Sequence, residues 1–104
     1  MNALARTRIL EDLTNHAEYL ATDDAEVAER FLDAFETTLE RLEQMPYIGV
    51  VAVLDNPALF GLRRWPIKGF EKYVILYLVL EDVVDLVRVL HTSQDLIAIL
   101  EAEP

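Results

Sequence analysis

The fold is decided by residues 61–96, GLRRWPIKGFEKYVILYLVLEDVVDLVRVLHTSQDL. Within this stretch, residues 73–80 are an unbroken apolar run rich in β-branched and aromatic side chains, which predicts a central β-strand. Residues 83–91 form a second such run and predict a second strand. Only Glu81 and Asp82 separate the two, so we expect a tight antiparallel hairpin.

Alternation along this hairpin divides its side chains between two faces. With Leu80 opposite Val83, one face is more aliphatic and carries Val74, Leu76, Leu78, Val87 and Val89. The other face carries Tyr73, Ile75, Tyr77, Leu86, Arg88 and Leu90. We expect the aliphatic face to pack against helices. The Tyr and Arg face would then point outward, where it could meet a partner or a substrate.

The residues before the hairpin predict two helices. Apolar residues recur at helical spacing in 2–20, although residues 1–8 are compatible with a short strand as well as with the helix that we favour. Thr7 is a candidate cap for this helix. Residues 24–44 predict a second helix, which Asp23 would cap. Because the connection is short, the two helices should form an antiparallel hairpin.

The remaining segments complete an α+β domain. Residues 62–68 predict a short strand, which Pro66 restricts to an edge because proline cannot donate to the ladder. Residues 50–54 are either a buried loop or an extra edge strand, and 95–101 predict a short C-terminal helical turn. The expected architecture is therefore a helix hairpin packed on a three- to four-stranded antiparallel sheet, with residues 1–104 as a single domain.

Composition limits the classes of function. The net charge is −10, and residues 1–44 hold eleven acids against four arginines, which predicts an acidic helical side. Such a chain repels nucleic-acid phosphates except at a local basic patch. There is no cysteine and the two histidines lie far apart, so we expect no disulfide, metal or cofactor. No apolar run is long enough for a bilayer, and no secretory pattern is visible, so we expect a cytoplasmic protein.

A basic patch is the first candidate site. It comprises Arg63, Arg64, Lys68 and Lys72. Phe70 lies in the turn between the last two and is a candidate aromatic anchor for a partner. Trp65 and Ile67 alternate with the basic residues and should face the core. The alternative interpretation of the patch is a solvated edge, since surface charges are the norm.

Arg88 has two interpretations. It is either a partly buried arginine paired with a carboxylate, or a guanidinium that binds phosphate or a partner beside Tyr73 and Tyr77. These three residues would be the catalytic candidates of a ribonuclease, although tyrosine is a poor base at a pKa of about 10. His91 should lie on the opposite face from Arg88, as a strand-end histidine bonded to backbone. For His16 we expect a solvated or helix-packing role.

An ordered set of segments resembles the ParE branch of the RelE/ParE toxin superfamily. These segments are 61–73, the Tyr77 strand, Arg88 to His91 with Asp95-Leu96, Asp12-Leu13, Ala28 to Phe31, and Leu42 to Gly49. The resemblance covers roughly residues 9 to 100. It implies the toxin half of a type II toxin–antitoxin pair, with an antitoxin whose extended C-terminal segment wraps the toxin. The family's functional basic residues would be Arg63, Arg64, Lys68, Lys72 and Arg88.

The resemblance leaves three functions open. The first is a ParE-like toxin that inhibits DNA gyrase by protein binding. The second is a RelE-like, ribosome-dependent endoribonuclease that cleaves mRNA, with Arg88 clamping the phosphate. The third is an inactive homologue that only binds its antitoxin. Self-association as a homodimer, or a toxin–antitoxin heterotetramer, is compatible with all three.

Overall fold

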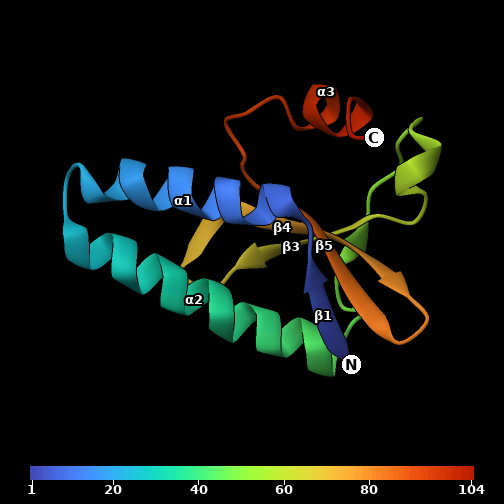
Figure 1. The fold of residues 1–104 in the computed structure, drawn as a ribbon, viewed down its shortest axis with the longest axis horizontal. Coiled ribbons are helices and arrows are strands. Elements are labelled where there is room, and N and C mark those ends of the chain that lie inside the picture. The colour runs from blue at the N-terminus through green and yellow to red at the C-terminus, as the bar shows by residue number, and fades with distance from the viewer.

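The computed structural model describes residues 1–104 as one sheet with helices on both sides (Figure 1). The elements in chain order are β1 (Asn2–Ala5), α1 (Thr7–Ala21), α2 (Ala25–Gln44), β2 (Val50–Val51), the 3-10 turn η1 (Pro57–Leu59), β3 (Arg63–Ile67), β4 (Phe70–Leu80), β5 (Val83–His91) and α3 (Leu96–Glu101). The five strands lie in the order β1-β5-β4-β3-β2. None of the helices combines the length and the apolar character that crossing a membrane requires. The α+β class and the helix hairpin are confirmed.

The expected sheet of three to four antiparallel strands is wrong, because β1 adds a parallel edge. β1 pairs with the start of β5, where Asn2 lies opposite Val83. The Nη2 of Arg6 then donates a hydrogen bond to Oδ2 of Asp85 at 2.9 Å, and this ion pair holds the end of β1 to β5. The helix that we favoured for residues 1–8 begins only at Thr7, which is therefore not its cap. A four-residue strand without alternation gives no local signal, since its partner lies at the other end of the chain.

The second helix follows the prediction closely. It starts one residue later than expected, because Asp24 rather than Asp23 is its cap and accepts from the Glu26 N–H at 2.9 Å. Phe31, Phe35 and Leu42 form its buried stripe. Through this stripe α2 packs against the sheet.

The β4–β5 hairpin has the expected turn but not the expected register throughout. Leu80 lies opposite Val83, and Glu81 in the turn takes a left-handed φ of 43°. Beyond Tyr77 the register shifts by one residue, because Leu76 pairs with Arg88 while Tyr77 pairs with Leu86. Val87 is thus the extra residue of a β-bulge.

A regular register continued from Leu80 opposite Val83 would pair Leu76 with Val87, Ile75 with Arg88 and Tyr73 with Leu90, and the bulge displaces all three pairs. Leu76 does not oppose Val87, and Ile75 lies opposite Val89 instead of Arg88. Tyr73 lies opposite His91 instead of Leu90.

The expected orientation of the two faces is also wrong. Tyr73, Ile75 and Tyr77 pack with Ile9, Phe31, Phe35 and Leu42 from the helices. The aliphatic face instead forms a second core with η1, Leu62 and α3, which comprises Leu59, Leu62, Val74, Leu76, Leu78, Val87, Leu90 and Leu100. Because of the bulge, Val89 faces the helices and Leu90 faces the second core, the reverse of their expected pairing with the tyrosine and aliphatic faces. Because both faces of the hairpin are covered, hydrophobicity alone could not tell which one the helices take.

Tyr77 joins the sheet to the segment after α2. Its hydroxyl donates to the Pro46 carbonyl at 2.8 Å and accepts from the Gly49 N–H at 2.9 Å. A side chain at Gly49 would collide with this hydroxyl, so the close approach requires glycine. Burial raises the pKa of Tyr77, so the phenol stays protonated and donates.

We expect Tyr77→Phe to lower the free energy of unfolding by about 1–3 kcal/mol, because it leaves a buried N–H and a carbonyl without their partner. Chemical denaturation measures the change. Tyr19→Phe is the control, since Tyr19 is 73% exposed and should alter stability little. Equal stability of the two variants would contradict the structural role of the Tyr77 hydroxyl.

Candidate functional site

Arg88 is enclosed by two carboxylates from opposite ends of the chain. Its Nε and Nη2 donate to the two oxygens of Asp12 in α1 at 2.7 and 2.8 Å. Its Nη1 donates to Glu103 at 2.9 Å. All three side chains are less than a tenth exposed. The bonds to Asp12, with those to Glu103, hold the pKa of Arg88 above its ordinary value despite burial.

This arrangement confirms the interpretation of Arg88 as a buried arginine paired with a carboxylate. It overturns the expectation that its guanidinium points outward. The sequence carried a signal for one partner, because Asp12 stands in the apolar stripe of α1 between Ile9 and Leu13. Asp12 also accepts a hydrogen bond from the Val89 N–H at 3.0 Å. Its carboxylate therefore binds the β5 backbone as well as the Arg88 guanidinium. Nothing in the local sequence identified Glu103.

Glu103 belongs to a C-terminal segment that closes the second core. Leu100 is 3% exposed and packs in that core, with Leu96 and Ile99 at its margin. The Asn56 amide donates to the carbonyls of Leu100 and Glu103 at 2.9 and 2.8 Å. The C-terminal segment is therefore held by the ion pair between Glu103 and Arg88, by the hydrogen bonds from Asn56 and by the apolar contacts of Leu100.

The other expected hairpin residues are also internal. Tyr73 is 6% exposed and packs against Phe31 and His16 at ring distances of 4.9 Å. Burial, with a smaller effect of Tyr19, raises the pKa of Tyr73, so this phenol stays protonated near neutral pH and has no free site for a proton. His16 is a packing histidine whose Nε2 lies 2.8 Å from the Val89 carbonyl. His91 Nδ1 accepts from the Ser93 backbone N–H at 3.0 Å, as a strand-end histidine should.

The basic patch is split by the strands rather than gathered on one face. Arg63 donates to the Gly49 carbonyl at 2.8 Å and lies over the Tyr47 ring, so it fastens the loop before β2. Arg64, Lys68 and Lys72 are exposed. Phe70 is half-buried, with its ring 5.4 Å from that of Phe31.

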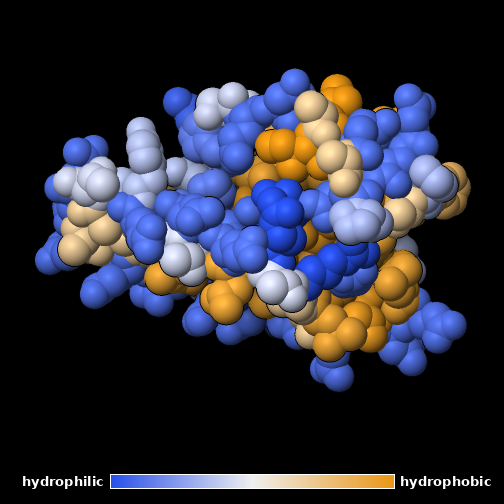
Figure 2. All heavy atoms as spheres, turned by 45° about the horizontal axis from the view of Figure 1, so that its top comes forward, coloured by the Kyte–Doolittle hydropathy of each residue, from blue (hydrophilic) through white to orange (hydrophobic).

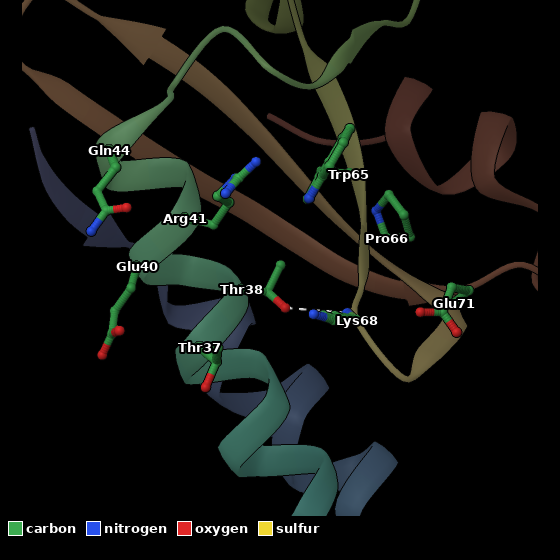
Figure 3. Close-up of a pocket in the computed structure, with 9 residues that line it drawn as sticks. All are labelled: Thr37, Thr38, Glu40, Arg41, Gln44, Trp65, Pro66, Lys68 and Glu71. Carbon is green, nitrogen blue, oxygen red and sulfur yellow. Dashed lines mark hydrogen bonds between the residues drawn. The ribbon is translucent and has the colours of Figure 1, made fainter.

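A groove of about 520 Å³ lies between α2 and β3 (Figure 3). It is lined by Thr37, Thr38, Glu40, Arg41, Gln44, Trp65, Pro66, Lys68 and Glu71. Arg41 and Trp65 point toward one another across it. Thr38 closes its floor, because its hydroxyl accepts from the Lys68 backbone N–H at 3.2 Å. Of this set, the sequence singled out only Lys68 as a site residue, since α2 and β3 are brought together by the fold.

Apolar surface gathers at the sheet end of the molecule, whereas polar side chains cover the helix hairpin (Figure 2). The loop around β2 is exposed, with Val53 at 95% and Phe60 at 91%. Val50, Val51 and Val53 are exposed, so of the two interpretations of residues 50–54 the extra edge strand is confirmed, as β2, and the buried loop is wrong. The tyrosine-bearing face contributes none of this surface.

Comparison with known proteins supplies a family for this geometry. A family model described as the ParE toxin of the type II toxin–antitoxin system parDE matches residues 5–96. A search of curated proteins finds no match.

We expect Arg88→Ala to lower the free energy of unfolding by about 3–5 kcal/mol, because it leaves two buried carboxylates without a counter-charge. Arg64→Ala, at an exposed position of β3, is the control and should cost about 0.5 kcal/mol or less. Thermal and chemical unfolding of both variants check this. An Arg88→Ala chain as stable as the control would contradict the structural role of Arg88.

Proposed function

The chain belongs to the ParE toxin family of type II toxin–antitoxin systems, and from that premise we propose that it acts in the cytoplasm by binding and inhibiting DNA gyrase. A cognate antitoxin neutralises it by binding the same chain. Toxicity on this proposal comes from occupying a protein surface, and no bond is cleaved.

The burial of Arg88 is the observation that carries this proposal. Cleavage of RNA would need a guanidinium free to meet the charge that develops on a phosphate. The Nε, Nη1 and Nη2 groups of Arg88 already donate hydrogen bonds to Asp12 and Glu103 at 2.7–2.9 Å, in a site closed to solvent. A phosphate would have to displace both carboxylates and the C-terminal segment that carries Glu103.

The tyrosines weaken the ribonuclease alternative further. Tyr73 and Tyr77 lie under the helices, on the side of the sheet where a transcript has no access. Burial raises the pKa of both phenols, so neither is ready to accept a proton near neutral pH. A binding function asks for none of these groups and uses surface side chains instead.

The surface that we assign to target binding is the exposed part of the basic patch. It comprises Arg64, Lys68 and Lys72, while Arg63 supports it by holding the loop before β2. Phe70 adds a half-buried aromatic edge beside it. On a chain of net charge −10, these cations along β3 and the start of β4 favour contact with an acidic partner surface, although they do not share one face of the sheet.

Purified gyrase tests the proposal. We expect the wild-type chain to inhibit supercoiling, and the triple variant Arg64→Gln, Lys68→Gln and Lys72→Gln to need about tenfold more protein, since each surface charge contributes about 0.5 kcal/mol. The control is Arg8→Gln with Arg30→Gln, which removes two exposed charges from the helices instead. The control should inhibit like wild type, and all chains should unfold at the same temperature.

Expression of the chain alone separates the alternatives. Growth arrest with intact supercoiling and cleaved transcripts would reject gyrase in favour of RNA cleavage. A chain that binds the product of a neighbouring antitoxin gene but arrests no growth would be the inactive homologue. Either result would contradict the proposed activity.

A further inference from the structure

The groove between α2 and β3 concentrates hydrogen-bond donors on an acidic protein. The ion pairs of the structure engage Arg6, Arg8 and Arg88, and the groove cations Arg41 and Lys68 are in none of them. The Trp65 indole nitrogen, which can only donate, is turned into the same groove (Figure 3). The groove is thus complementary to a group that carries acceptors and negative charge.

The acids that line the groove do not cancel this complementarity. The Glu40 side chain points away from Trp65 and Lys68 (Figure 3). Glu71 accepts from the Gly69 N–H within its own turn, so its carboxylate serves the β3–β4 connection. Neither acid forms an ion pair with Arg41 or Lys68, so both cations are available to an incoming carboxylate.

The dimensions and the surrounding charge limit the ligand. A volume of about 520 Å³ accommodates a few side chains. A long polyanion such as nucleic acid would extend past the groove onto the exposed acids of α2, which include Glu36 and Asp33, and would be repelled there. A peptide segment with one or two carboxylates avoids that repulsion.

We propose that this groove binds a short acidic segment of a partner protein, with its carboxylates on Arg41 and Lys68 and its chain packed on the Trp65 indole. Arginine offers a carboxylate two parallel N–H donors, which fixes the orientation of the segment. The inference rests on the proposed function only in that the chain works by binding proteins. It adds Arg41 and Trp65 to the interaction surface and gives the partner its chemistry.

The position of the only tryptophan provides a local test. We would titrate the full chain with the acetylated, amidated peptide Gly-Glu-Glu-Leu-Gly and follow Trp65 fluorescence, using Gly-Gln-Gln-Leu-Gly as the neutral match. We expect a saturable change with the acidic peptide alone. Arg41→Gln, which removes the two-donor contact, should weaken binding about tenfold, and Lys68→Gln about twofold, the loss expected for one exposed charge. Arg30→Gln, at an exposed position in the first half of α2, should leave binding unchanged.

Three results would overturn the inference: no saturable change, an equal response to the neutral peptide, or inorganic phosphate binding as tightly as the acidic peptide. The last would make the groove a phosphate site. The gyrase assay is independent of this titration. Peptide binding with normal supercoiling would keep the groove and reject gyrase, whereas inhibition without peptide binding would reject the groove alone.

Discussion

The guanidinium of Arg88 lies where three parts of the chain meet: α1 through Asp12, β5 through its own backbone, and the C-terminal segment through Glu103. A charge taken out of water costs several kcal/mol unless close partners compensate it, and here two carboxylates do so. The consequence is geometric as well as energetic. The cluster fixes how α1 sits against β5 and holds the C-terminal segment over the far face of the sheet.

That second cover explains the character of the hairpin. Strands with one wet face alternate between apolar and polar residues, but β4 is apolar on both sides because helices cover one face and η1 with α3 cover the other. The tyrosines go to the helical side, where Tyr77 finds backbone partners and Tyr73 finds aromatic ones. Arg88 is the polar exception, and its partners had to be supplied from outside the sheet.

The sequence predicted what local patterns determine. Strand β5 and the turn at Glu81 and Asp82 were predicted correctly, since apolar runs and their interruption are local. The parallel edge β1, the bulge at Val87 and the orientation of the hairpin depend on contacts between distant residues. Of the candidate site, the exposed cations were found from the sequence, and the place of Asp12 in the apolar stripe of α1 was a signal for one partner of Arg88, whereas Glu103, Arg41 and Tyr47 gain their roles only from the fold.

The proposed function rests on where charge is committed to the structure and where it is left available at the surface. Arg88 and Arg63 hold the structure together, while Arg64, Lys68, Lys72 and Arg41 remain on the surface of a strongly acidic chain. A protein with this division is suited to recognising another protein by charge. The proposal of a binding function follows from this division, because the arginine and the two tyrosines that we considered for a ribonuclease are buried.

The most direct test of this account is the nitrogen–proton NMR spectrum of the arginine side chains in water. The Arg88 guanidinium should give resolved, slowly exchanging Nε–H and Nη–H signals, because it is bonded on both sides and closed to solvent. The other arginines should exchange faster. An Arg88 guanidinium that exchanges as rapidly as those of Arg64 and Arg30 would show that the charge is free, and would contradict the account.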